Sequence, residues 1–550
     1  MIMEKLSNSK TQSWLGWFLR GALILGFVIV IGRLIELQII KGDYYRDLAE
    51  GNRIRRVPIS APRGTILARG GELLVGNKEI KNRVIFDPGS GYKKTANIRD
   101  ATEEEIITEW ERDYKLGAAA AHISGYVGEV NEEELETINP QCPEKGPRKI
   151  GQLVGRSGLE QQYECILSGV DGEELVEVDS SGKKIRVLGK KDPIPGENIQ
   201  TTINYFLQEK VADIIVKNED MPLERQGAVI ITDPRGEVLA LYSSPSYDPN
   251  IFVGGDDQNK IGEVLNDKNL PLFNRVIGGS FAPGSVYKPV VAIAALEEEE
   301  IDEEYIYEDK GQITMKTLYG EYSYANWYFT QYGRTEGEIG LVRAIARSTD
   351  TFFYTIGELV GIEKLVDWSH KLGLGEKTGI DLPGEISGLV PTPEWKEEVK
   401  GERWFLGNTY HVSIGQGDLS LTPIGINTSI STIASNGFLC EPKIVGDEKC
   451  KDLDIDTSNL ELVKEGMVGV CSEDGTGFTF FDFSPQVACK TGTAETNIED
   501  ETHAWFTVFA PSDFPEIVAT VLVEKGGEGS QVAGPIAREI FDYWFNDRNE

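Results

Sequence analysis

Two lysine-containing motifs are the places in this chain where chemistry could occur. Ser285 and Lys288 lie three residues apart at the head of an apolar run, and Lys490-Thr491-Gly492-Thr493 follows far downstream. Residues three apart in a helix share one face, one turn from each other. The amine of Lys288 can therefore reach the hydroxyl of Ser285 and take its proton, which makes a nucleophile without a histidine. Lys490 would supply the fixed positive charge that a carboxylate-bearing substrate needs.

Further copies of both motifs show that neither is specific by itself. Ser-x-x-Lys also begins at Ser7, Ser180 and Ser181, and Lys-Thr-Gly also begins at Lys377. Ser7 lies in a polar tail, and Ser180 and Ser181 lie in a predicted turn. Lys377 lies in a loop-like stretch. Only sequence context can therefore select the copies that carry chemistry.

The context of Ser285 predicts a tight turn that leads into a buried helix. A Pro-Gly turn precedes it, and Pro289 opens the apolar run that follows. With Ser285 as the N-cap, the proline falls in the first helical turn, where its missing N–H costs little. The positive end of the helix dipole would help to keep Lys288 neutral, as a base must be. The motif alone also fits a solvated lysine beside a capping serine.

The context of Lys490 predicts a short strand in a sheet. Residues 503–510 and 517–523 are predicted to be its neighbouring strands. A strand edge beside a nucleophilic helix can place a lysine and a backbone N–H at one reacting carbonyl. Elsewhere the sequence predicts an acidic helical part over Glu103–Trp110, one amphipathic helix over 151–166, a hairpin over 176–188, a helix over 204–216 and a strand-turn-strand over 228–243. This pattern predicts an α/β (α+β) fold, with the nucleophile between a helical part and an antiparallel sheet.

Composition narrows the class of protein. The 550 residues have room for two or more domains, and the formal net charge of −34 argues against a nucleic-acid partner. The four histidines are scattered, so no metal site is expected, and no phosphate-binding loop or other cofactor motif is present. The six cysteines give no readable pairing, although Cys440, Cys450 and Cys471 could pair in an exported domain.

An apolar segment near the N-terminus predicts a single membrane anchor. Residues 15–32 are apolar apart from Arg20 and are long enough to approach the thickness of a bilayer core. Lys5, Lys10 and Arg20 favour a cytoplasmic N-terminus. No cleavage site follows, so an uncleaved signal anchor is expected, with a cytoplasmic tail over 1–13, the span over 14–35 and the rest outside the cytoplasmic membrane, in the periplasm or its equivalent.

A third element lies between the two lysine motifs. By itself, the segment from Arg347 to Tyr354 is an ordinary helix start, with Ser348 as the cap and Phe352 and Phe353 in the core. The order Ser-x-x-Lys, then Ser-x-Asn or Ser-x-Asp, then Lys-Thr-Gly is the signature of penicillin-binding proteins and serine β-lactamases.

The chain resembles class B penicillin-binding proteins, most closely the penicillin-binding protein 2 group that serves cell elongation. Besides the three motifs and the single anchor, the resemblance covers ordered matches along nearly the whole chain: Ala61-Pro62-Arg63-Gly64, Gly155-Arg156-Ser157-Gly158-Leu159-Glu160-Gln161-Gln162-Tyr163, Pro271-Leu272-Phe273-Asn274-Arg275, Asp381-Leu382-Pro383-Gly384-Glu385 and Gly415-Gln416-Gly417. It implies a mostly β pedestal (dimerisation-type) domain over 36–200. A transpeptidase domain of the penicillin-binding and serine β-lactamase fold is implied over 201–550.

The resemblance implies a peptidoglycan D,D-transpeptidase without cofactor or metal. Ser285 would attack the D-Ala-D-Ala carbonyl of a stem peptide, and an acceptor amine would resolve the acyl-enzyme. Lys288 would take the serine proton, and Ser348 would relay protons with help from Asp350. The terminal carboxylate would bind at Lys490, Thr491, Gly492 and Thr493. The N–H groups of Ser285 and Thr493 would form the oxyanion hole, and β-lactams would acylate Ser285.

Departures from the family pattern concern partners more than chemistry. Asp350 replaces the commoner asparagine, Ala68-Arg69-Gly70-Gly71 replaces a usual Asp-Arg-x-Gly, and residues 77–118 are short for a pedestal head. Glycan polymerisation is expected from a separate membrane glycosyltransferase of the RodA/FtsW type, within a set of elongation-complex proteins. Two alternatives stay open: a D,D-carboxypeptidase or β-lactamase-like hydrolase, and a non-catalytic scaffold or β-lactam sensor. The sequence leaves the stem-peptide chemistry, the acceptor amine, the envelope type and the oligomeric state open.

Overall fold

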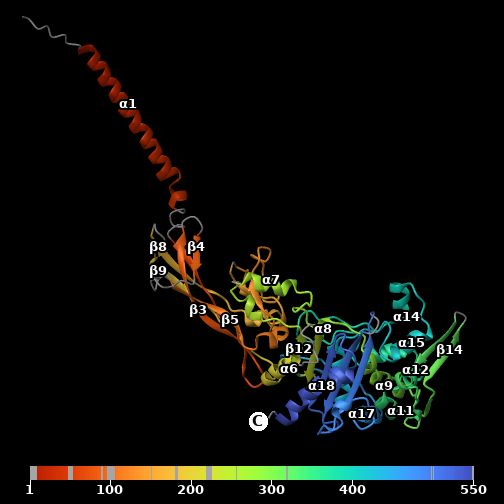
Figure 1. The fold of residues 1–550 in the computed structure, drawn as a ribbon. Helices are drawn as coiled ribbons and strands as arrows, with labels where there is room; N and C mark the ends of the chain where they lie inside the picture. The colour runs from red at the N-terminus through yellow and green to blue at the C-terminus, as the bar shows by residue number, and fades with distance from the viewer. Residues whose placement is uncertain are drawn as a thin grey trace, which may run out of the picture. The chain divides into compact units, whose positions relative to one another are not determined.

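The computed structural model describes residues 9–46, 54–87, 91–95, 106–149, 151–179, 184–217, 226–254, 257–317, 320–496, 498 and 501–547 (Figure 1). The chain forms two compact units. The first comprises Met1–Pro62, Glu79–Trp110 and Gly169–Pro195, and the second comprises Arg63–Lys78, Glu111–Ser168 and Gly196–Glu550. The division of the chain at residue 200 stays a prediction.

The first unit holds the apolar helix and a small antiparallel sheet. Helix α1 spans Ser9–Ile35 and runs on into a π-helical turn, Glu36–Ile40. Within the described part of the chain, Trp14–Ile40 is the one helical stretch long and apolar enough to cross a membrane. The sheet has the order β1-β8-β9, with β1 at Ile54–Ile59, β8 at Gly172–Val178 and β9 at Lys184–Lys191. Strands β8 and β9 confirm the predicted hairpin, whose turn at Ser180 and Ser181 lies outside the described residues, as does Ser7.

One predicted helix in the N-terminal half is wrong, and a second is only partly helical. The segment predicted as an acidic helix is strand β5, Ile106–Tyr114, which pairs with β3, Leu73–Asp87 (residues 103–105 lie outside the described part). Arg112 and Tyr114 alternate into the interior, so burial with period two outweighs the glutamate run. The predicted helix over 151–166 is instead strand β7, Leu153–Gly155, followed by two short helices, α4 at Gly158–Gln162 and α5 at Glu164–Leu167.

The second unit is built on a five-stranded antiparallel sheet in the order β12-β11-β21-β20-β19 (Figure 1). Its strands are β11 at Gly227–Thr232, β12 at Val238–Ser244, β19 at Ala488–Glu495, β20 at Thr502–Ala510 and β21 at Ile517–Val523. Lys490 lies opposite Thr507 of β20. All five strands were predicted, because continuous β-branched and aromatic runs between turn residues are typical of buried strands.

Both faces of this sheet are covered by helices. Helix α18, Gly529–Asp542, packs on β20 and β21 and also on α6, Tyr205–Lys217. Helix α16, Pro423–Ala434, packs on β11 and β21, where Asn427 Nδ2 donates to Thr520 Oγ1. Strand β21 is therefore buried along its whole length, and it is fully apolar apart from Thr520.

The helical part of this unit packs against the edge strand β19. Its helices are α9 at Lys288–Glu297, α11 at Leu341–Arg347, α12 at Asp350–Val360, α13 at Ile362–Lys371, α15 at Leu406–Ser413 and α17 at Thr457–Val470. Helix α9 packs against α12, α13 and α17, and α17 also packs against α11 and contacts β19.

A buried ion cluster in the second unit joins two of the sequence motifs. Glu160 is 0% exposed and accepts hydrogen bonds from both Arg63, at 2.8 Å, and Arg112, at 2.7 Å. Glu164 pairs with the same Arg63 at 2.8 Å. A second link runs from Tyr163, whose hydroxyl donates to Asp381 Oδ2 at 2.7 Å. The matched motifs thus hold this part of the fold together through buried, paired charges.

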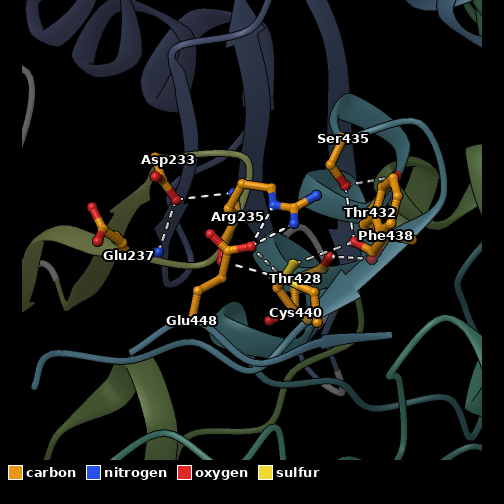
Figure 2. The surroundings of a disulfide bond; sticks show 10 residues. Asp233, Arg235, Glu237, Thr428, Thr432, Ser435, Phe438, Cys440 and Glu448 are labelled. Carbon is orange, nitrogen blue, oxygen red and sulfur yellow. Dashed lines mark hydrogen bonds and ion pairs between the residues drawn. A yellow bond between two sulfur atoms is a disulfide. The ribbon is translucent and has the colours of Figure 1, made fainter. Parts of the chain in front are cut away.

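Three disulfides are present: Cys142–Cys165, Cys440–Cys450 and Cys471–Cys489. Figure 2 shows the surroundings of the second, which links strands β17, Phe438–Cys440, and β18, Cys450–Asp452, near Arg235 and Glu448. The sequence named Cys440, Cys450 and Cys471 as candidates but not the partners.

Candidate active site

Ser285 lies on a single 3₁₀ turn, Gly284–Tyr287, that leads directly into α9. The predicted N-cap role is wrong, because Tyr287 occupies that position, but Pro289 does fall in the first helical turn. Gly284 has φ +57°, and its N–H donates to Gly415 O at 2.8 Å. The positive φ turns the chain so that Ser285 stays half-buried and reachable while Lys288 is 0% exposed.

Lys288 is held by groups from the start of α12. Its Nζ donates to Asp350 Oδ1 at 2.7 Å, to the carbonyl of Ser348 at 2.7 Å and to the hydroxyl of Ser348 at 3.1 Å. No hydrogen bond joins Lys288 to Ser285 among the described residues. Ser285 lies on the turn that leads into α9, and Lys288 is the first residue of that helix. The amine of Lys288 is hydrogen-bonded to Ser348 and Asp350.

Lys490 reaches the same hydroxyl from the sheet side. Its Nζ donates to Ser348 Oγ at 2.9 Å and to the carbonyl of Thr491 at 3.0 Å, and its side chain is 0% exposed. Ser348 Oγ is therefore contacted by both lysines, although 142 residues separate it from Lys490 in the sequence.

The backbone at Ser348 presents this hydroxyl. Ser348 ends α11 in the left-handed region, φ +56°, and Thr349 is the N-cap of α12. The prediction that Ser348 caps the following helix is wrong, whereas Phe352 and Phe353 lie in the core as predicted. A non-glycine residue with positive φ is uncommon and costs free energy, which the contacts of both lysines offset.

Asp350 is oriented by two residues that sequence reasoning missed. Its Oδ2 accepts the backbone N–H of Trp327 at 3.0 Å, and its own N–H donates to Asn326 Oδ1 at 3.2 Å. Asn326 is 0% exposed and also donates to Asp309, at 3.2 Å. No sequence signal marks Asn326, because a single asparagine before an aromatic run has no periodicity or motif.

Burial dominates the electrostatics of the cluster. It lowers the pKa of Lys288, against the opposing effect of the Asp350 carboxylate. Burial also holds the pKa of Lys490 well below its ordinary value, and the nearby charge of Lys288 adds to this effect. Both amines contact the hydroxyl of Ser348, so a proton on one disfavours a proton on the other. Both lowered pKa values make the neutral amines, which can accept protons, easier to reach than in a free lysine.

Strand β19 lies directly against the turn that carries Ser285. A Cβ on Gly284 would lie 2.9 Å from Thr493 O, and one on Gly492 would lie 2.9 Å from Pro283 O. Thr493 is exposed, and its Oγ1 accepts the N–H of Gly529 at 3.3 Å. The glycines thus allow an approach of backbone to backbone that brings Ser285 and Thr493 side by side.

Thr491 has a hydroxyl partner that the sequence did not reveal. Its Oγ1 lies 2.8 Å from Thr476 Oγ1, in the loop after α17. By contrast, the second Lys-Thr-Gly copy, at Lys377, is a loop in which the N–H and hydroxyl of Thr378 both donate to Glu385 Oε1. The structure therefore brings together the motif residues selected by context and places the other copy in a structural role.

Residues 227–542 match the penicillin binding protein transpeptidase domain, which is more than half of the chain. The chain belongs to this family. Residues 93–201 match the penicillin-binding protein dimerisation domain. The peptidoglycan D,D-transpeptidase MrdA of Haemophilus influenzae is 31% identical over 96% of this chain and 92% of its own length. MrdA of Escherichia coli K12 is 31% identical over 96% and 94%.

Solved structures give the same family. The penicillin-binding protein PBP2 of Helicobacter pylori, in complex with MreC, has a TM-score of 0.76 and 27% identity, and the match covers 90% of this chain and 99% of that chain. PBP2 of Pseudomonas aeruginosa, in complex with WCK 5153, has a TM-score of 0.72 and 30% identity over 90% and 98%. The expected class, a serine-type D,D-transpeptidase of the elongation-type penicillin-binding protein 2 group, and its transpeptidase fold are confirmed.

Proposed function

We propose that Ser285 is the nucleophile of this D,D-transpeptidase and that the lysine cluster runs its proton transfers. This proposal rests on one observation: Lys288 and Lys490 both contact the hydroxyl of Ser348, and Ser285 lies on the turn just before α9. Ser285 Oγ attacks the D-Ala-D-Ala carbonyl carbon, the peptide C–N bond breaks, and the terminal D-alanine leaves. An acceptor amine then attacks the ester and restores Ser285.

Lys288 in its neutral form takes the proton of Ser285 as the new C–O bond forms. The lowered pKa of Lys288 makes this form accessible, and Asp350 fixes the direction of its amine. Ser348 bridges the two lysines, so its hydroxyl can pass a proton to the leaving nitrogen. Reversal of this path removes a proton from the acceptor amine in the second half of the reaction.

The strand supplies substrate recognition. The carboxylate of the terminal D-alanine binds at Lys490, Thr491, Gly492 and Thr493. Its negative charge raises the pKa of Lys490 and favours the ammonium form that pairs with it. The N–H groups of Ser285 and Thr493 form the oxyanion hole, since the Gly284 contact sets these two residues beside each other.

The apolar helix α1 anchors the enzyme with its catalytic unit outside the cytoplasmic membrane. Three disulfides support this side, because disulfides persist in oxidising compartments. Residues 36–200 form the pedestal and 201–550 the transpeptidase domain. The partners are stem peptides, β-lactams, a RodA/FtsW-type glycosyltransferase and other elongation proteins. A chain from a peptidoglycan synthase complex that coordinates polymerization and crosslinking supports this, with a TM-score of 0.74 and 28% identity over 98% of this chain.

Product analysis tests the proposal. The full-length chain in detergent is given lipid-linked disaccharide pentapeptide and a membrane glycosyltransferase, beside Ser285→Ala and a control, Ser280→Ala. Ser280 lies shortly before the nucleophile, and its hydroxyl is hydrogen-bonded to that of Ser420 at 2.6 Å. We expect cross-linked dimers with wild type and Ser280→Ala and none with Ser285→Ala. Trimmed monomers alone would indicate a hydrolase, and partner binding without any product would indicate a scaffold.

A further inference from the structure

The disulfide Cys471–Cys489 lies directly beside the substrate-binding strand. Cys489 immediately precedes Lys490 in β19, and Cys471 ends α17. Both cysteines are buried, with exposed fractions of 0% and 5%. The bond therefore ties the end of a helix to the residue next to Lys490.

Helix α17 also contacts the element that carries Ser348. A Cβ on Gly466 would lie 2.8 Å from Ile345 Cβ, and one on Gly469 would lie 2.9 Å from Ala346 Cβ. These contacts are with α11, which ends at Arg347, just before Ser348. The helix thus packs closely on one part of the catalytic cluster and is covalently joined to another.

The loop Cys471–Gly477 rests on the sulfur atoms. A Cβ on Gly477 would lie 2.8 Å from Cys489 Sγ and 3.1 Å from Cys471 Sγ. The N–H of Gly477 donates to Val470 O at 2.8 Å, which closes the loop back onto α17. The neighbouring residue, Thr476, lies 2.8 Å from the hydroxyl of Thr491.

The other side of the loop is held by Arg347. Its Nη1 donates to Asp474 O at 2.7 Å, while its Nε donates to Glu336 at 2.7 Å. This loop therefore contacts both the residue before Ser348 and the hydroxyl of Thr491, and it packs against the disulfide.

We infer that the Cys471–Cys489 disulfide and the loop Cys471–Gly477 position Lys490 and Thr491 for the substrate carboxylate. This inference rests on the proposed function of these two residues. The loop and the disulfide touch no substrate, so they act through the strand. A shift of about 1 Å in a positioning group can cost about 10²-fold in rate, and the covalent link and the Thr476–Thr491 contact oppose such a shift.

Carboxylate recognition gives a readout that a purely structural role would not move. We would measure the second-order rate constant for acylation of the full-length protein by a fluorescent penicillin and by its methyl ester, which lacks the carboxylate charge. The rate constant for the acid divided by that for the ester reports recognition of the carboxylate. In Cys471→Ser/Cys489→Ser we expect this ratio to fall by about ten- to a hundredfold, with the ester rate little changed.

The matched control removes a different disulfide. In Cys440→Ser/Cys450→Ser the ratio should equal that of wild type, since this bond lies near Arg235, Glu448 and Phe438 and none of these belongs to the cluster (Figure 2). Thr476→Val keeps all three disulfides, removes the contact with Thr491, and should also lower the ratio. It decides the question if the first double variant does not fold.

Two outcomes separate this inference from the proposed function. A wild-type ratio in both Thr476→Val and any folded Cys471→Ser/Cys489→Ser would overturn the inference while Ser285 acylation stands. An equal fall of acid and ester rates would overturn it as well, because it would indicate a general loss of structure. Absence of wild-type acylation at Ser285 would overturn the proposed function and this inference together.

Discussion

Replacing Asp350 with asparagine should move the pH dependence of acylation to lower pH. Asp350 Oδ1 lies 2.7 Å from Lys288 Nζ in a pair whose side chains are 13% and 0% exposed. Asparagine has nearly the same shape and can still accept one hydrogen bond from the amine, but it carries no charge. The substitution therefore isolates the electrostatic effect of the carboxylate on the base.

The sign and size follow from the geometry. The Asp350 carboxylate raises the pKa of Lys288, so its removal lowers that pKa and increases the fraction of neutral amine at a given pH. An opposite charge at this range shifts a pKa by about 1–3 units, and each unit corresponds to about 1.4 kcal/mol. The ascending limb of the rate profile should therefore move to lower pH. The plateau should fall, because the amine loses a directional partner.

The assay is the rate of acylation by a fluorescent penicillin at a series of pH values, with folding checked by circular dichroism at each. Asp381→Asn is the matched control, since that carboxylate binds Tyr163 and two backbone N–H groups and not a lysine. Its limb should coincide with that of wild type. A limb in Asp350→Asn that stays in place or moves to higher pH would refute the assignment of Lys288 as the base.

Two further substitutions test other parts of the account. Replacing Glu160 with glutamine should lower the free energy of unfolding by about 3–5 kcal/mol, because buried Arg63 and Arg112 lose their shared carboxylate; an unchanged denaturant midpoint would contradict this. Those arginines hold the pKa of Glu160 below its ordinary value, so its stabilisation is present above the unfolded pKa and is lost as the pH falls through the folded one. The difference between wild type and Glu160→Gln should accordingly shrink in acid, and a constant difference would argue against the ionised cluster. Replacing Gly284 with alanine should slow acylation about 10- to 100-fold, since the new Cβ would lie 2.9 Å from Thr493 O in backbone of positive φ; a wild-type rate would count against the close approach.

The sequence predicted the helices and strands that position the site, but not the turns and hydrogen bonds that connect them. Strands β19, β20 and β21 and the buried helix after Ser285 follow from local runs of apolar residues, which need no tertiary information. The turn at Ser348 does not, because a serine with positive φ is selected by the two lysines that contact it, one of them 142 residues away. The role of Asn326 could not be predicted either, because its hydrogen-bond partner, the N–H of Asp350, lies 24 residues further along the chain.

The errors in the N-terminal half have one physical cause. The glutamates that precede β5 in the sequence favour a helix by local propensity, yet pairing with β3 and burial of Arg112 and Tyr114 make β5 a strand. Disulfide pairing was unreadable for a related reason, since spacing along the chain does not say which cysteines meet in space. Cys489, next to Lys490, was the one whose partner mattered most to the site.

Intact-protein mass spectrometry after incubation with penicillin shows directly whether Ser285 is the nucleophile. The full-length protein in detergent is compared with Ser285→Ala, and peptide mapping locates the modified residue. We expect one adduct of the mass of penicillin on Ser285 in wild type and none in the variant. A folded wild-type protein with no adduct, or an adduct that persists in Ser285→Ala, would contradict the assignment of the nucleophile.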